Sequence, residues 1–270
     1  MVRVEEALAE ALPGVEPRTL RTIESGWDSV AVEVDGEWIL RVARRDEVAA
    51  TYRVEIALLP ELAPLFPVAV PVPVRSGPDW ILTRRIPGEP FQTGAEIRPL
   101  GELLAALHAF DVERASQLGA EAHDPQTDVE RFRTHVLPLL EPDEQAAAEA
   151  LLEEHAAAAY EPRLTHADLG PEHVLVARGR VSGVIDWTDM RIGDPAIDLA
   201  WALEASPDIA SAYPVDASVA RRALLYHALG PWHEVHYGLL LGNTRWVSSG
   251  LAGVRARLPK VTGTPDTMAR

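Results

Sequence analysis

Near the start of the chain, the spacing of hydrophobic residues changes from the alternation typical of strands to the period of a helix. Valines at every second position from 30 to 34 are followed by Asp35-Gly36, a dipeptide typical of hairpin turns, and strand-forming residues resume over 38–42. From 46 to 62 the apolar residues recur at helical spacing behind an acidic first turn, which predicts a helix. Residues 80–82 predict one further strand. Together these patterns predict a small antiparallel sheet with one main helix.

The rest of the chain is mostly helical in pattern. Alanine- and leucine-rich segments predict helices over 99–110 and 143–160, and helices are predicted again over 219–258. Between them, the segment 163–187 predicts two short strands joined by a turn.

Pro87-Gly88 ends the strand pattern that begins with residues 80–82, and two lobes are expected to meet there. Residues 1–86 are predicted to form the N-terminal lobe, and residues 87–270 a larger, mainly helical C-terminal lobe. The predicted class is therefore a bilobal α+β fold. A chain of 270 residues with 47% hydrophobic content is large enough to bury a core in such an arrangement.

The amino-acid composition limits which kinds of partner and site the protein can have. The formal charge of −16 disfavours nucleic acid, whose phosphates it would repel, and favours a cationic small molecule. The only lysine is Lys260, so a group that holds phosphate must be an arginine, a backbone amide or a metal ion. The absence of cysteine excludes disulfides, zinc-thiolate sites and a cysteine nucleophile, and it suits the cytoplasm. The first 14 residues predict an amphipathic helix and not a signal peptide, and no apolar run predicts contact with a membrane.

Candidate chemistry is concentrated in one segment of the predicted C-terminal lobe. His166-Ala167-Asp168 stands five residues ahead of His173, and Asp186 follows an apolar strand. Phosphoryl transfer requires a carboxylate that orients the attacking hydroxyl and metal ligands that neutralise phosphate charge. Asp168 and Asp186 occur in the order that this chemistry needs. A capping aspartate beside a buried histidine is the alternative for the first group taken alone.

A phosphate anchor is predicted in the N-terminal lobe. Arg41 shares a strand face with Ile39, so a cation for phosphates and an apolar contact for a nucleotide base fall side by side. An arginine offers a two-pronged donor for phosphate oxygens. Its expected partner is Glu55 on the following helix, with Glu47 and Glu61 as competitors.

No glycine-rich phosphate loop of the Walker or dinucleotide-binding type is present. Gly26 and Ser29 mark the predicted turn over the phosphates, and the base is expected near residues 82–86. The choice between ATP and GTP is left open.

The chain resembles the aminoglycoside phosphotransferases and their relatives, which share the protein-kinase-like fold. The resemblance spans about residues 26 to 200 and rests on these strings: Gly26-Trp27-Asp28-Ser29, Leu40-Arg41-Val42-Ala43-Arg44, Leu100-Gly101-Glu102-Leu103-Leu104-Ala105-Ala106-Leu107-His108, His166-Ala167-Asp168-Leu169-Gly170-Pro171-Glu172-His173-Val174-Leu175, Val184-Ile185-Asp186-Trp187 and Gly193-Asp194-Pro195-Ala196-Ile197-Asp198-Leu199-Ala200. It implies a bilobal protein-kinase-like fold, with Asp168 as the catalytic aspartate and Asp186 as the principal Mg²⁺ ligand.

His173 departs from the commonest pattern of that family, which has an asparagine metal ligand at this position. Mg²⁺ prefers hard oxygen ligands, so an imidazole is chemically unexpected there. The macrolide phosphotransferases carry a histidine in a similar string. We expect His173 to contact metal or phosphate, and the alternative is a hydrogen bond to the loop backbone alone. Asp194 is expected to cap a helix, and Asp198 to point back toward the catalytic loop.

The leading hypothesis is a nucleotide-dependent O-phosphotransferase that uses ATP or GTP with Mg²⁺ and acts on a hydroxylated, cationic aminoglycoside or macrolide. Acidic residues outside the predicted nucleotide site would favour amino groups on the acceptor: Asp189, Glu204 and Asp208. A kinase of choline, homoserine or a sugar and a non-catalytic nucleotide-binding regulator are the alternatives. A metal-dependent hydrolase would need His166, Asp168, His173 and Asp186 to converge on one ion.

Overall fold

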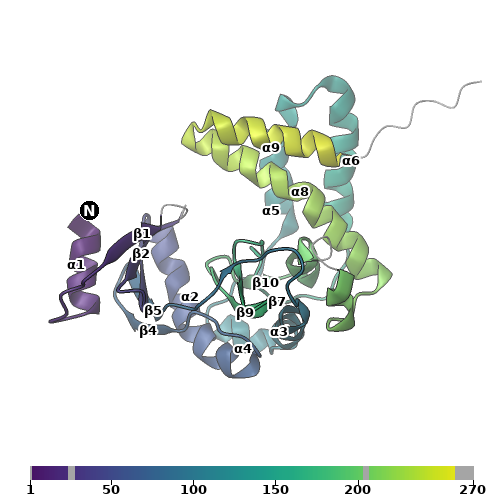
Figure 1. The fold of residues 1–270 in the computed structure, drawn as a ribbon. Helices are drawn as coiled ribbons and strands as arrows, with labels where there is room; N and C mark the ends of the chain where they lie inside the picture. The colour runs from purple at the N-terminus through teal and green to yellow at the C-terminus, as the bar shows by residue number, and fades with distance from the viewer. Residues whose placement is uncertain (1, 24–27, 203–206, 259–270) are drawn as a thin grey trace, which may run out of the picture. The chain divides into compact units, whose positions relative to one another are not determined.

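The computed structural model describes residues 2–23, 28–202 and 207–258 (Figure 1). The chain forms two compact units. The larger unit comprises Met1–His123 and Glu161–Asp216, and the helical unit comprises Asp124–Tyr160 and Ala217–Arg270.

A five-stranded antiparallel sheet with the order β1-β2-β3-β5-β4 begins the larger unit. Its strands are β1 (Leu20–Ile23), β2 (Ser29–Val34), β3 (Trp38–Ala43), β4 (Pro73–Ser76) and β5 (Trp80–Arg84). The predicted hairpin is present, because Asp35 and Gly36 join β2 to β3 with φ angles of 53° and 70°. Two consecutive left-handed residues twist a hairpin turn in the sense that its strands require.

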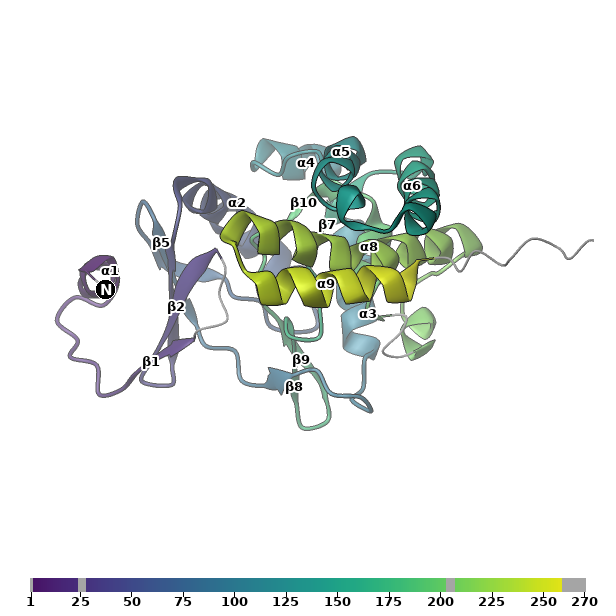
Figure 2. The same cartoon turned by 90° about the horizontal axis from the view of Figure 1, so that it is seen from above.

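Each face of the sheet is covered by one helix (Figure 1 and Figure 2). The first helix, α1 (Val2–Ala11), packs Ala7 and Ala11 against Leu40 of β3 and its neighbours. The second, α2 (Asp46–Leu62), covers the opposite face with Val48 and Tyr52. Alternate residues of a strand point to opposite faces, so Arg41 of β3 faces α2 while Leu40 faces α1. The bounds of α2 match the predicted helix.

The remainder of the larger unit consists of short elements. They are η1 (Ala63–Leu65), β6 (Glu89–Pro90), α3 (Arg98–His108), α4 (Val112–Gln117), β7 (Arg163–Thr165), β8 (Val174–Ala177), β9 (Arg180–Val184), β10 (Arg191–Gly193), η3 (Pro195–Leu199) and η4 (Pro207–Ser211). The strands form a three-stranded sheet, β6-β8-β9, and a two-stranded antiparallel pair, β7 with β10. The loops after β7 and β9 carry the predicted catalytic segment.

The helical unit has its own apolar core. Its elements are α5 (Pro125–His135), η2 (Leu137–Leu139), α6 (Pro142–Ala157), α8 (Ala217–Leu241) and α9 (Thr244–Arg257). Phe132 of α5 packs on Trp232 of α8 with ring centroids 5.6 Å apart. Glycines allow α8 and α9 to approach closely, since a Cβ at Gly250 would lie 2.8 Å from the backbone nitrogen of Val235. In the described part of the chain, no helix combines the length and apolar character needed to cross a bilayer.

The predicted α+β class is confirmed, with an antiparallel sheet at the N-terminal end and mainly helical structure toward the C-terminal end.

Candidate active site

Arg41 and Glu55 form a buried ion pair in the larger unit. Arg41 Nη1 donates to both carboxylate oxygens of Glu55, at 3.1 and 2.9 Å, and the exposed fractions of the two side chains are 12% and 0%. The guanidinium also lies 5.1 Å from the centre of the Tyr52 ring. A buried carboxylate needs such a partner to remain charged. The predicted pairing with Glu55 is therefore present, whereas Glu61 pairs with Arg114.

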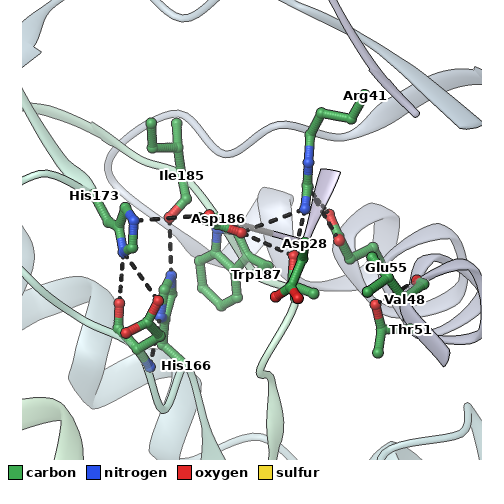
Figure 3. Close-up of polar contacts among 12 residues, drawn as sticks. Asp28, Arg41, Val48, Thr51, Glu55, His166, His173, Ile185, Asp186 and Trp187 are labelled. Carbon is green, nitrogen blue, oxygen red and sulfur yellow. Dashed lines mark hydrogen bonds and ion pairs between the residues drawn. The ribbon is translucent and has the colours of Figure 1, made fainter. Parts of the chain in front are cut away.

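The second terminal nitrogen of Arg41 reaches the loop after β9. Nη2 donates to Asp186 Oδ1 at 3.3 Å and also hydrogen-bonds to the Thr188 hydroxyl. That hydroxyl donates to the same carboxylate oxygen of Asp186 at 2.8 Å. Arg41 thus joins Glu55 of α2 to Asp186, as Figure 3 shows. Sequence reasoning did not identify Thr188.

His173 brings the two predicted aspartates together. Its Nδ1 lies 3.5 Å from Asp168 Oδ2, and its Nε2 lies 3.7 Å from Asp186 Oδ2. Nδ1 also donates to the backbone oxygen of Asp168 at 2.7 Å, so the expected alternative of a loop hydrogen bond is present as well. The side chains of Asp168 and Asp186 are 53% and 43% exposed. Both carboxylates therefore open to solvent around one imidazole.

The charges in this group shift one another's ionisation. Burial raises the pKa of Asp168, although His173 opposes the shift. Burial would lower the pKa of His173, but Asp168 and Asp186 outweigh it and the pKa lies above its ordinary value. Burial also disfavours the charged form of Asp186, yet Arg41 and His173 hold the pKa of that carboxyl below its usual value. Asp168 is consequently the stronger base of the two.

His166 ties the two loops to each other. Its Nδ1 accepts the backbone N–H of Asp168 at 3.3 Å, and its Nε2 donates to the carbonyl oxygen of Ile185 at 3.1 Å. This pattern requires a neutral imidazole with the proton on Nε2, and burial indeed lowers the pKa of His166. Both ring nitrogens are occupied, so His166 does not join a metal site in this geometry. The hydrolase hypothesis, which required it as a ligand, is not supported.

Two residues of the site hold a left-handed backbone without being glycine. Ala167 has a φ of 66° and Asp186 a φ of 62°. Such angles are strained for residues with a Cβ and persist only where other contacts fix them. Asp198 provides these contacts for Ala167, because its carboxylate accepts the backbone N–H groups of His166 and Ala167 at 2.9 and 2.8 Å. Asp198 thus points back to the loop as expected, and Asp194 caps η3 as expected.

Ser29 lies at the edge of this contact network, next to Tyr52, whose ring faces the Arg41 guanidinium. It is buried in β2 beside Tyr52, while its neighbour Asp28 pairs with Arg45 at 2.5 Å. Gly26, the other residue of the predicted phosphate turn, lies outside the described residues. A role for Ser29 toward nucleotide stays a prediction.

Asp189 is a further carboxylate near the predicted catalytic aspartate. Burial raises its pKa to about 6, and the negative charge of Asp168 adds to the shift. Glu204 and the side chain of Asp208, the other acidic groups expected to favour a cationic acceptor, lie outside the described part.

Asp186 and His173 are the groups that can hold a divalent cation. No cluster of three or more histidine and acidic side chains suited to a metal is found among the residues that the structure describes. Mg²⁺ in phosphoryl-transfer sites is commonly held by one or two protein groups together with substrate phosphates, at about 2.0–2.1 Å, so that neighbouring ligands lie about 3 Å apart. The 3.7 Å between His173 Nε2 and Asp186 Oδ2 is wider than that spacing, although the two groups face each other. The pair could share an ion with phosphate once this distance shortens.

Comparison with known proteins identifies the family to which this chain belongs. The profile of the phosphotransferase enzyme family (APH) matches residues 19–234, and the chain belongs to this family. Viomycin phosphotransferase of Streptomyces vinaceus is 37% identical over 143 residues, which cover 46% of this chain and 49% of that protein. Homoserine kinase of Gluconacetobacter diazotrophicus is 38% identical over 122 residues, which cover 41% and 38% of the two chains. The matched segments thus span half or less of these relatives.

Solved structures share the fold over nearly the whole chain. The GDP and kanamycin complex of APH(2″)-IIIa superposes with a TM-score of 0.84 at 22% identity, covering 95% of this chain and 98% of that one. A macrolide 2′-phosphotransferase from Brachybacterium faecium superposes with a TM-score of 0.74 at 27% identity, covering 98% and 100%. The predicted resemblance to the aminoglycoside phosphotransferases and the predicted protein-kinase-like fold are confirmed.

Proposed function

We propose that this protein transfers the γ-phosphate of ATP or GTP to a hydroxyl group of a small molecule. The observation that carries the proposal is the convergence of Asp168 and Asp186 on His173, next to the Arg41–Glu55 pair. Phosphoryl transfer depends on positioning and charge stabilisation more than on covalent chemistry by the protein, and this group supplies both.

Asp168 orients the acceptor. Its carboxylate is half-exposed, so a hydroxyl can reach it, and its raised pKa makes it a better proton acceptor than an ordinary aspartate. The hydroxyl donates its hydrogen bond to Asp168 and passes its proton to that carboxylate as the new O–P bond forms. The bond between the γ-phosphorus and the β–γ bridging oxygen breaks at the same time, and the nucleoside diphosphate leaves. His173 limits the rise of the Asp168 pKa that burial causes.

Arg41 holds the phosphates of the nucleotide. Glu55 fixes the guanidinium from behind, and Asp186 lies against its second terminal nitrogen. The base lies against the backbone near residues 82–86, and Ser29 contributes from β2. In this proposal residues 1–86 are the nucleotide-binding lobe and residues 87–270 the catalytic and acceptor-binding lobe. The relative APH(2″)-IIIa was solved with GDP, which supports a nucleotide as donor without deciding between ATP and GTP.

Asp186 and His173 would hold Mg²⁺. When bound, the ion neutralises negative charge on the phosphate oxygens during transfer. Asp186 stays ionised for this task because Arg41 and His173 counter the effect of burial on its pKa. His173 would bind the ion through Nε2, since its Nδ1 donates to the backbone oxygen of Asp168.

The acceptor is a cationic aminoglycoside or macrolide antibiotic. Relatives named for viomycin, kanamycin and macrolides support an antibiotic, and the net charge of −16 with Asp189 near Asp168 favours amino groups on it. The protein acts in the cytoplasm without nucleic acid or membrane as a partner. A kinase of a small metabolite is the second candidate, because homoserine kinase matches part of this chain at 38% identity.

A transfer assay with labelled nucleotide separates these candidates. ATP and GTP are each tested with Mg²⁺ and with viomycin, kanamycin, streptomycin, erythromycin or homoserine as acceptor. We expect transfer to one antibiotic, its loss in Asp168→Asn, and its retention in the matched surface variant Asp143→Asn, which alters an exposed residue of α6. Transfer to homoserine alone would favour the metabolite kinase. Nucleotide binding without transfer to any acceptor would favour a non-catalytic regulator.

A further inference from the structure

A buried polar chain links Tyr213 to the loop that carries Asp168. The Tyr213 hydroxyl lies 2.6 Å from His108 Nδ1, and His108 Nε2 lies 3.0 Å from Asp198 Oδ2. The rings of His108 and Tyr213 meet edge to face, with centroids 5.2 Å apart at 90°. All three side chains are buried. His108 comes from α3, Asp198 from η3, and Tyr213 from the segment between η4 and α8.

Asp198 connects these three buried side chains to the backbone of the loop that carries Asp168. Its two oxygens accept the N–H groups of His166 and Ala167, and Ala167 is the strained residue immediately before Asp168. Burial opposes ionisation of Asp198, yet His108, His166 and the backbone N–H of Ala167 together outweigh it, and the pKa of Asp198 lies below its ordinary value. An ionised carboxylate at this place keeps the peptide in its left-handed conformation.

The Tyr213 hydroxyl satisfies the ring nitrogen of His108 that does not face Asp198. An ionised carboxylate only accepts hydrogen bonds, so Nε2 of His108 must carry a proton. In the neutral imidazole Nδ1 then holds a lone pair, which the Tyr213 hydroxyl satisfies as a donor. Without that hydroxyl, a buried ring nitrogen loses its partner and the orientation of His108 is held from one side only.

We propose that Tyr213 is a positioning residue for phosphoryl transfer: through His108 and Asp198 it fixes the His166–Ala167 backbone and so the direction of the Asp168 carboxylate. This role rests on the proposed function. Tyr213 contacts His108, and the path from there to Asp168 runs through Asp198 and the loop backbone. Its effect is therefore confined to the geometry of Asp168 and leaves nucleotide and acceptor affinity unchanged.

Tyr213→Phe tests the role, because it removes only the hydroxyl. We expect kcat to fall about tenfold, the cost of one net hydrogen bond to a polar network, while KM for nucleotide and for acceptor stays within about twofold. The matched control is Tyr226→Phe in the helical unit, where Tyr226 meets His155 edge to face with centroids 4.8 Å apart at 83°. That variant should keep the full kcat. An unchanged kcat in Tyr213→Phe, or a rise in KM alone, would overturn the proposal.

Hydrogen exchange gives a readout that needs no turnover. In the free protein, the amides of His166 and Ala167 should exchange slowly, and faster in Tyr213→Phe and in His108→Leu. His108→Gln retains an amide donor for Asp198 and should restore slow exchange and most of kcat relative to His108→Leu. Equal exchange in wild type and Tyr213→Phe would refute the positioning role, even if no acceptor is phosphorylated. Absence of turnover in the wild type would count against the proposed function alone.

Discussion

Replacing Arg41 by methionine is expected to expose the dependence of Glu55 on its partner. Glu55 is completely buried, and its two oxygens both accept from Arg41 Nη1, at 3.1 and 2.9 Å. Methionine keeps much of the volume of arginine but carries no charge. The variant therefore leaves a buried carboxylate without its counter-ion. Asp186 also loses a contact, but it is 43% exposed and keeps His173 nearby, so this loss adds little.

Breaking a buried ion pair from one side costs about 3–5 kcal/mol, because the remaining charge is left desolvated. We expect Arg41→Met to lower the free energy of unfolding by that amount at neutral pH. Burial raises the pKa of Glu55, and without Arg41 nothing of comparable strength opposes the rise. The folded state then binds a proton more tightly than the unfolded state does. The destabilisation should consequently be largest above the folded-state pKa of Glu55 and fade as pH falls through it.

Urea unfolding of three variants measures this effect. The double variant Arg41→Met with Glu55→Met removes both charges and should recover most of the loss, since an apolar pair of similar volume is often neutral or stabilising. Arg114→Met is the matched control, because Arg114 pairs with Glu61 of the same helix α2 at exposed fractions of 47% and 37%. It should change the free energy of unfolding far less than Arg41→Met does, because solvent screens an exposed pair. A loss in Arg41→Met no larger than in Arg114→Met, or no recovery in the double variant, would refute the reasoning.

Three further outcomes are expected. Asp168→Asn should lower kcat at least about a thousandfold while the Kd for nucleotide, measured by calorimetry, stays unchanged, because the carboxylate acts on the acceptor hydroxyl. His173→Asn should keep substantial transfer activity in the same steady-state assay in which Asp186→Ala nearly abolishes it, and equal loss in both would show that the asparagine analogy is wrong. The pKa of Asp189 is raised from 3.8 to about 6, so ionising it costs stability as pH rises through that window. Asp189→Asn should therefore match wild type in urea unfolding at pH 4 and exceed it at pH 8, and equal stability at both pH values would contradict the shift.

Local patterns predicted the sheet lobe well. The hairpin at Asp35-Gly36 and the helix over Asp46–Leu62 have strong local signals, namely a turn dipeptide and an acidic first turn with a helical period. Strand alternation pointed to Arg41, and its pairing with Glu55 was expected by analogy with the strand–helix ion pair of kinases. In these cases the residues that decide the structure are close neighbours in the chain.

Elements that depend on distant contacts were not predicted. The α5 helix (Pro125–His135) has few apolar residues, and only Asp124 as cap with Pro125 at the first turn marked its start. The left-handed backbone at Ala167 has no local cause, because alanine does not favour it and Asp198, far along the chain, holds it. The link from Tyr213 to His108 spans 105 positions and likewise has no local signature.

The placement of a nucleotide between the two aspartates is the central claim. A crystal structure with Mg²⁺ and a non-hydrolysable ATP or GTP analogue would test it most directly. The predicted result is a terminal phosphate between Asp168 and Asp186, with Arg41 on the phosphate oxygens. A nucleotide bound elsewhere, with Asp168 or Asp186 turned away from its phosphates, would contradict it.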